Sequence, residues 1–270
     1  MSNTKKYNIV FFGTKEDTII LLKHLKNTSN LPNLVVTLDP NVKKYHISGK
    51  GNVYDYCIKN NIELFSISDY TLNDKTCKDF FTSNNFDLGI SYGWQRIIPK
   101  HVLDSFKIGI FGFHGSPLGL PYGKGRSPFN HSIIEGKSNI FNHFFKYENG
   151  IDNGPFYSTT KFEINSFDNI NSLNMKSLLI AKKEINNIIK DYNKDKIKTT
   201  KQDNSIEETF YPKRTPKDGK INLYQSTTDI YNFIRAISKP FPGAFLYLND
   251  EKFIIWDAVP FDNILDFSNF

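Results

Sequence analysis

The chain has 270 residues, of which 39% are hydrophobic and 15% aromatic, so it is long enough to bury a large core and its composition does not indicate disorder. Its net charge of +6 comes from lysines that are scattered rather than clustered, so nucleic-acid binding is not expected. No segment approaches the roughly 20 apolar residues of a membrane span, and the polar residues 1–6 lead into no run typical of a signal peptide. Cys57 and Cys77 have no metal or redox spacing, so we expect reduced thiols in a cytoplasmic protein.

The first half of the sequence alternates short apolar runs with helical patterns, which predicts a doubly wound, mostly parallel α/β sheet of Rossmann-like type. Strands are expected at residues 7–12, 34–38, 62–65, 87–92 and 108–113. A first helix is expected from the apolar pattern Ile19, Leu22 and Leu25, and further helices at 52–60 and 75–84. Ligands bind at the carboxyl ends of the strands in such sheets. We therefore expect the chemistry just after residues 92 and 113.

The middle of the chain continues this pattern. Ser127 followed by Pro128 predicts a helix start with Ser127 as the N-cap, and that helix is expected to end near Gly136. Two further strands are expected at residues 142–147 and 156–164. A long amphipathic helix is expected at 169–193, and the polar residues 191–208 predict a linker or exposed loop.

The last part of the chain predicts a small α+β subdomain. It contains an extended segment at 211–216, a helix at 227–238, and strands at 244–248 and 252–256 around Asn249-Asp250, which is a hairpin signal. We predict two domains, residues 1–205 and 206–270. Because a two-stranded ribbon is barely stable alone, the hairpin is expected to help form a homodimer.

His114 and Asp152 are the candidate chemical groups. His114 comes at a strand end, Asp152 lies in the glycine-flanked turn 150–154, and the glycine-rich loop 123–128 lies between them. A lone histidine is usually a core residue and aspartate is common in turns, but the three features together suit a hydrogen-bonded acid–base pair. An imidazole ring can both accept and return a proton at physiological pH.

Several motifs in this order resemble the folate-dependent formyltransferases, the family of methionyl-tRNA formyltransferase, glycinamide ribonucleotide transformylase and the sugar N-formyltransferases. The motifs are His114, Leu120-Pro121, Gly125-Arg126, Pro128 and Ile151-Asp152-Asn153-Gly154. The C-terminal strings Arg235-Ala236 and Pro242-Gly243-Ala244-Phe245 resemble the sugar N-formyltransferase branch. The resemblance covers nearly the whole chain. The C-terminal part is short for the barrel of the tRNA enzyme, so an aminoacyl-tRNA acceptor is the less expected alternative.

The resemblance implies that N10-formyltetrahydrofolate donates a formyl group to the amine of a nucleotide-linked amino sugar used in a surface polysaccharide such as lipopolysaccharide. His114 would handle the protons and Asp152 would steady the imidazolium. Arg96 and Arg126 are expected to bind anionic groups of the substrate. An exposed Trp94 beside a glycine favours folate binding in this segment. The expected folate-binding residues are Tyr92, Gly93, Trp94, Gln95, Ile97, Gly150 and Ile151.

Gly112 departs from the family, which has an asparagine two positions before the histidine to hold the formyl oxygen as it becomes an oxyanion. Three explanations stay open: a backbone N–H or another amide (Gln95 or Asn130) substitutes, a protonated His114 acts alone, or the protein is catalytically weak. The last would make it a folate or nucleotide-sugar binding protein. The other histidines lack metal-ligand spacing and Gly13 lacks the glycines of a dinucleotide fingerprint, so neither a metal nor NAD is expected.

Overall fold

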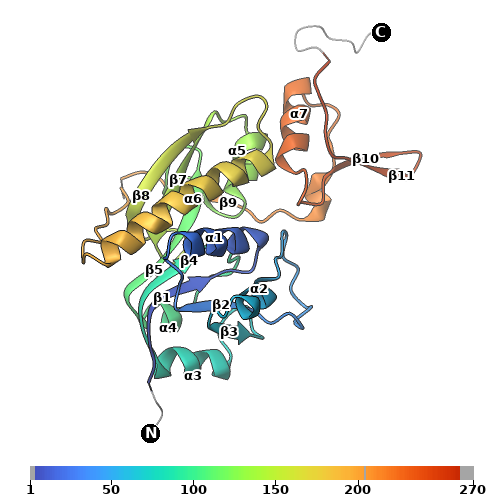
Figure 1. The fold of residues 1–270 in the computed structure, drawn as a ribbon. Coiled ribbons are helices and arrows are strands. Elements are labelled where there is room, and N and C mark those ends of the chain that lie inside the picture. Colours follow the sequence, from blue (N-terminus) through green and yellow to red (C-terminus); the bar gives the residue numbers. More distant parts are fainter. Residues whose placement is uncertain (1–3, 204, 262–270) are drawn as a thin grey trace. The chain divides into compact units, whose positions relative to one another are not determined.

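The computed structural model describes residues 4–203 and 205–261 (Figure 1). Three parts of the chain lie outside the described residues: 1–3, 204 and 262–270. The first and last of these are the outer ends of the two predicted domains. In chain order the elements are β1 (Lys6–Phe12), α1 (Glu16–Asn27), β2 (Leu34–Leu38), α2 (Val53–Lys59), β3 (Leu64–Ile67), α3 (Lys75–Ser83), β4 (Asn85–Ser91), α4 (Lys100–Leu103), β5 (Phe106–Ser116), β6 (Lys124–Gly125), α5 (Pro128–Ile134), β7 (Asn139–Lys146), β8 (Phe156–Glu163), α6 (Ile170–Tyr192), β9 (Phe210–Tyr211), the 3₁₀ helix η1 (Pro216–Gly219), α7 (Thr227–Ala236), β10 (Ala244–Leu248) and β11 (Glu251–Ile255).

The main sheet has seven strands in the order β3-β2-β1-β4-β5-β7-β8. β1 pairs in parallel with both β2 and β4, and the pairs β2–β3 and β4–β5 are also parallel. The chain winds outward from β1 to β3 and then returns to β4 on the other side of β1. This reversal creates a switch point at the carboxyl ends of β1 and β4, where ligands bind in open α/β sheets. The predicted doubly wound, mostly parallel fold is confirmed.

Helices cover the sheet on two faces, which explains why all five residues of β2 are buried. On one face, which we call the α1 face, α1, α2 and the C-terminal part of α6 share an apolar cluster with Phe11 and Phe111. On the other, the α3 face, α3 and α4 share a cluster with Phe12 and Ile110. Side chains alternate along a strand, so Gly112 and His114 lie on the same face as Ile110, the α3 face.

Local capping determines where several helices begin. Asn52, Asp74 and Ser226 each accept a hydrogen bond from a backbone N–H in the first turn of α2, α3 and α7. Pro128 occupies the first turn of α5 as predicted, but the predicted N-cap role of Ser127 is wrong. Ser127 has a left-handed backbone, with φ 55°, and its side chain makes no capping hydrogen bond. An N-cap needs an extended backbone to aim its oxygen at the first turn.

The chain divides into two compact units. The first contains Met1–His114, Asn142–Thr160 and Leu178–Glu207, and the second contains Gly115–Phe141, Lys161–Ser177 and Glu208–Phe270. The second unit has its own core, which includes Ile133, Leu173 and Ile234, and it carries the antiparallel hairpin of β10 and β11 that the sequence predicts. The domain boundary predicted between residues 205 and 206 stays a prediction, because the units interleave along the chain.

The stretch 191–208 has more structure than the predicted linker. Thr200 exchanges two backbone hydrogen bonds with Phe156, at 2.7 and 2.8 Å, so the chain pairs with the start of β8. This return brings Gln202 to the turn that follows β7. Across the part of the chain that the structure describes, no helix has the length and apolar character that crossing a membrane requires.

Candidate active site

His114 and Asp152 meet in the first unit. His114 lies near the carboxyl end of β5, and its Nδ1 is 3.4 Å from Oδ2 of Asp152. The side chains are 8% and 20% exposed, so solvent screens their interaction only partly. A carboxylate at this position can orient the imidazole ring and stabilise the positive charge that the ring gains with a proton.

The turn that carries Asp152 has a demanding backbone. Asp152 itself has φ 50°, a left-handed conformation that aspartate adopts more readily than most residues. A β-carbon on Gly154 would lie 1.7 Å from the main-chain oxygen of Lys146, so only glycine fits there. Nε2 of Gln202 donates to the main-chain oxygens of Asp152 and Gly154, at 2.7 and 2.9 Å. The turn is therefore anchored by a residue from a distant part of the chain.

His143 on β7 is a second histidine near the pair. It is 3% exposed, its Nδ1 is 2.8 Å from Oγ1 of Thr159, and its ring stacks on Phe156 with centroids 4.3 Å apart. Burial lowers the pKa of His143 to about 4, with a smaller contribution from His114, so the ring is neutral at physiological pH. Within the described residues, no group of three or more His, Cys, Asp or Glu side chains is placed to hold a metal ion.

Tyr147, directly after β7, fills the space beside Gly112. A β-carbon on Gly112 would lie 1.9 Å from the phenolic oxygen of Tyr147. That hydroxyl is hydrogen-bonded to the side chain of Ser91, the residue paired with Gly112 in the β4–β5 register. Burial, with a contribution from the Asp152 carboxylate, raises the pKa of Tyr147 to about 12.

The predicted folate segment begins at the switch point, directly after β4. Oγ1 of Thr18 donates to the main-chain oxygen of Tyr92 at 2.9 Å, and Oγ1 of Thr14 donates to that of Gly93 at 3.0 Å. Gly93 has φ 80°, and a β-carbon there would lie 2.9 Å from Oγ1 of Thr18. The backbone of the segment is therefore held rigidly against α1.

Side chains of this segment differ in exposure. The expected exposure of Trp94 is wrong, because its ring packs edge-on against Tyr70 and Phe12, with centroids 4.7 and 5.8 Å away. The indole Nε1 is buried and has no hydrogen-bond partner among the described residues. Ile97 is 71% exposed, and its surface is open to a ligand. The backbone N–H of Gln95 donates to the hydroxyl of Tyr70 at 2.9 Å.

The two arginines expected at the substrate belong to different units. The Arg96 guanidinium lies over the ring of Tyr70, 5.1 Å from its centroid, and donates to the main-chain oxygen of Gln95. Arg126 belongs to the second unit, where its side chain is exposed and its backbone N–H donates to Tyr211 at 3.0 Å. Their roles in substrate binding stay predictions.

Other candidate residues have distinct surroundings. In the Asp152 turn, Gly150 has φ 119° and Ile151 is 46% exposed. Asn130, considered as a substitute for the missing family asparagine, is buried in the second unit, where its Nδ2 donates to the main-chain oxygen of Ala236 at 2.7 Å. Because this hydrogen bond links α5 to α7, the Asn130 amide already has a structural role.

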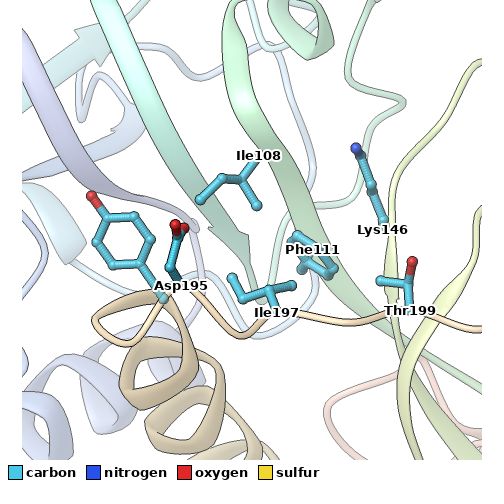
Figure 2. A pocket seen from close by; sticks show the side chains of 7 residues that line it. Ile108, Phe111, Lys146, Asp195, Ile197 and Thr199 are labelled. Atoms are coloured by element: carbon cyan, nitrogen blue, oxygen red, sulfur yellow. The ribbon is translucent and has the colours of Figure 1, made fainter.

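A pocket of about 240 Å³ opens in the first unit, apart from these residues (Figure 2). Ile108 and Phe111 of β5 line it together with the loop that follows α6, and both belong to the cluster of the α1 face. Lys146 and Asp195 contribute charged groups at its walls. None of the residues predicted for catalysis or binding lines it.

Comparison with protein families gives two matches that together span most of the chain. Residues 7–189 match the family model described as formyl transferase. Residues 213–266 match the formyl transferase C-terminal domain.

Individual relatives agree with this. The chain is 33% identical over 187 residues to the bifunctional polymyxin resistance protein ArnA of Wigglesworthia glossinidia brevipalpis. The aligned region covers 69% of this chain but only 28% of the length of that protein. Methionyl-tRNA formyltransferase from Clostridium thermocellum has a similar fold, with a TM-score of 0.64, 21% identity, and 91% and 89% of the two chains covered. An N-formyltransferase from Helicobacter canadensis, crystallised with folinic acid and dTDP-3-aminofucose, also has a TM-score of 0.64, with 20% identity and 90% and 84% covered.

Proposed function

The chain belongs to the formyl transferase family of formyl-transferring enzymes, and on that premise we propose that it moves the formyl group of N10-formyltetrahydrofolate to the amine of a nucleotide-linked amino sugar. The observation that carries the proposal is the 3.4 Å approach of His114 to Asp152. A buried imidazole beside a carboxylate is the arrangement that proton transfer between two amines needs.

The proposed reaction uses the pair as follows. The acceptor amine attacks the formyl carbon, and His114 takes the proton that the amine loses. Asp152 holds the ring and stabilises its positive charge until the proton passes to the folate nitrogen that leaves. Water competes with the amine, so the 8% exposure of His114 favours transfer over hydrolysis.

We propose that the donor binds at Tyr92, Gly93, Trp94, Gln95 and Ile97, with Gly150 and Ile151 from the turn. The exposed side chains of Ile97 and Ile151 offer apolar surface to the planar ring of the folate. The backbone at Gly93, which is packed closely against Thr18, offers peptide groups for hydrogen bonds. The buried Nε1 of Trp94, which lacks a hydrogen-bond partner within the described residues, is a further donor that a ligand could satisfy.

For the acceptor, support comes from the comparisons. The Helicobacter canadensis relative was crystallised with a nucleotide-linked amino sugar, and ArnA is a polymyxin resistance protein. We propose that Arg96 and Arg126 bind the phosphates of such an acceptor. The product would be an N-formylated sugar for a surface polysaccharide such as lipopolysaccharide.

Two rival functions remain. The Clostridium thermocellum relative is a methionyl-tRNA formyltransferase of similar fold, so aminoacyl-tRNA is the competing acceptor. A folate or nucleotide-sugar binding protein without turnover is the other, because Gly112 lacks the amide of the family. Mass spectrometry after incubation with the donor separates all three.

The setting of the enzyme is part of the proposal. The free buried thiols of Cys57 and Cys77 suit a cytoplasmic protein. The exposed apolar residues of the β10–β11 hairpin suit a homodimer. We further propose that residues 1–205 form the catalytic domain and residues 206–270 a C-terminal subdomain.

The direct test offers the protein N10-formyltetrahydrofolate with a panel of nucleotide-linked amino sugars, and in a separate reaction with charged initiator tRNA. We expect one amino sugar to gain the mass of a formyl group and the tRNA to remain unformylated. Formylation of the tRNA alone would support the rival acceptor. No formyl product, together with tight binding of folate, would support the binding protein.

A further inference from the structure

Gly112 and Tyr147 fit each other as a pair. The phenolic oxygen of Tyr147 lies 1.9 Å from the position that the β-carbon of any side chain at residue 112 would take. Gly112 has no left-handed φ, so its backbone would accept an asparagine, and Tyr147 is what excludes one. A polar group therefore already lies where the family carries its amide.

The position of Tyr147 is set by several independent contacts. Its backbone N–H donates to the main-chain oxygen of Ile110 at 2.7 Å, which joins the end of β7 to β5. Its ring packs at 5.3 Å from Phe145 and against the apolar cluster of the α3 face. These contacts hold the half-buried side chain against β5, with its hydroxyl beside Gly112.

The hydroxyl lies near the acid–base pair. Residues 112 and 114 point to the same face of β5, about 7 Å apart along the strand. The negative charge of the Asp152 carboxylate contributes to the raised pKa of the Tyr147 hydroxyl. The Tyr147 hydroxyl, which lies beside Gly112, is therefore on the same face of β5 as His114 and its partner Asp152. A reacting carbonyl group needs a proton carrier and an oxyanion donor close together in this way.

We propose that the Tyr147 hydroxyl takes over the task of the absent family asparagine and donates a hydrogen bond to the formyl oxygen during transfer. This proposal rests on the formyl transfer proposed above. It differs from the three explanations that the sequence leaves open, because the donor is neither a backbone N–H or amide nor His114, and the site still has an oxyanion donor for catalysis.

The acceptor nitrogen forms a bond to the formyl carbon while the carbonyl π electrons move onto oxygen, whose negative charge accepts the Tyr147 hydrogen bond. When that electron pair re-forms the C=O bond, the bond from carbon to N10 breaks. The proton lost by the acceptor amine passes through His114 to N10, so the products are the formamide and tetrahydrofolate.

The state of the hydroxyl suits this task. Its pKa of about 12 keeps the phenol protonated, so it can donate throughout the pH range of the enzyme. The hydrogen bond from the buried Ser91 lowers that pKa, as a hydroxyl that donates to the phenolic oxygen does. When Ser91 donates to the phenolic oxygen, the O–H of Tyr147 can itself donate to a substrate.

Replacement of Tyr147 by phenylalanine tests the proposal, because the ring and its packing stay while the donor is lost. We expect kcat for formyl transfer to fall about 10²- to 10³-fold, with the KM for the formyl donor raised no more than about tenfold and the melting temperature nearly unchanged. Tyr157→Phe is the matched control, since it removes a hydroxyl that bonds Asp191 and should leave kcat within about threefold. A Tyr147→Phe enzyme that keeps more than about a third of the native kcat would overturn the proposal.

A rescue experiment separates a missing donor from damaged packing. Tyr147→Ala opens the space beside Gly112, and Gly112→Asn then supplies the amide of the family. We expect the Gly112→Asn/Tyr147→Ala enzyme to exceed Tyr147→Ala at least tenfold in kcat, whereas Gly112→Asn alone should lower kcat because its side chain meets Tyr147. A Gly112→Asn enzyme faster than the native one would overturn the proposal.

A binding measurement keeps this test independent of the acceptor. Tyr147→Phe should weaken the affinity for 10-formyl-5,8-dideazafolate about 3- to 10-fold and leave that for 5,8-dideazafolate unchanged. Equal affinities of native and variant proteins for the formylated compound would contradict the hydrogen bond. Failure of every amino sugar to be formylated would instead reject the proposed acceptor and leave this binding difference intact.

Discussion

The side-chain amide of Gln202 anchors the turn that carries Asp152. Its Nε2 donates hydrogen bonds to the main-chain oxygens of Asp152 and Gly154, at 2.7 and 2.9 Å. The two residues lie far apart in sequence, and the pairing of Thr200 with Phe156 brings them together. Because Asp152 has a left-handed backbone, a turn without this anchor has less strained conformations available.

Replacing Gln202 by leucine should therefore loosen the turn. We expect kcat to fall about tenfold and the free energy of unfolding to fall by about 1–3 kcal/mol, the contribution of two hydrogen bonds to partly buried carbonyl groups. Steady-state kinetics and urea denaturation measure the two effects. Lys201→Ala, at an exposed neighbouring position, is the control and should change neither. Native kcat in the leucine variant would show that the turn needs no anchor.

Asp152→Asn should preserve the fold and lower the rate. Asparagine tolerates φ 50° as well as aspartate does, so the melting temperature should stay nearly constant. The loss of the carboxylate removes the group that stabilises a protonated His114, and kcat should fall about 10²- to 10⁴-fold. If stopped-time assays show less than a fivefold loss, Asp152 does not serve His114 in the reaction.

His143 should make the protein sensitive to acid. Its pKa is about 4 in the folded chain and about 6.5 in the unfolded one, so between these values only the unfolded chain binds the proton. Stability should therefore decrease as the pH falls from 6.5 to 4, by up to about 3 kcal/mol from this residue. His143→Gln, which cannot titrate, should lose less stability than the native protein over that window in urea denaturation. Parallel stability curves for the two proteins would contradict the burial effect.

The proposed homodimer can be tested at the hairpin. Leu248 and Phe253 are 56% and 43% exposed, an apolar surface that a partner subunit would cover. Sedimentation should show a dimer for the native protein and a monomer for Leu248→Lys/Phe253→Lys, with the circular dichroism spectrum unchanged. A native protein that stays monomeric at high concentration would reject this role of the hairpin.

The fold was predictable because it rests on periodicity. Apolar runs such as that of β2 and the long pattern of α6 mark strands and helices whatever their neighbours are. Turn conformations are less predictable: the left-handed backbone of Ser127, which removes its capping role, leaves no trace in residue type.

Of the candidate site, only groups with a local motif could be predicted. His114 and Asp152 each lie in a distinctive string, whereas Gln202 lies in a polar stretch without periodicity. Tyr147 is one of many aromatic residues in the sequence, and nothing in the residues around it indicates a function. Its proposed role depends on the contact with Gly112, which forms only when β5 and β7 fold together. The one signal available was the glycine itself, since a vacated volume has to be filled by some other group.

The most direct test of the account is the rate of formyl transfer by His114→Ala, measured together with folate affinity. We predict that kcat falls at least 10²-fold, within the range of about 10²–10⁴ for general acid–base groups, while the dissociation constant for the folate changes less than about threefold. His143→Gln, which alters the neighbouring buried histidine, is the matched control and should keep most of the activity. An alanine variant that retains more than about a tenth of the native kcat would contradict the central claim that His114 carries the proton.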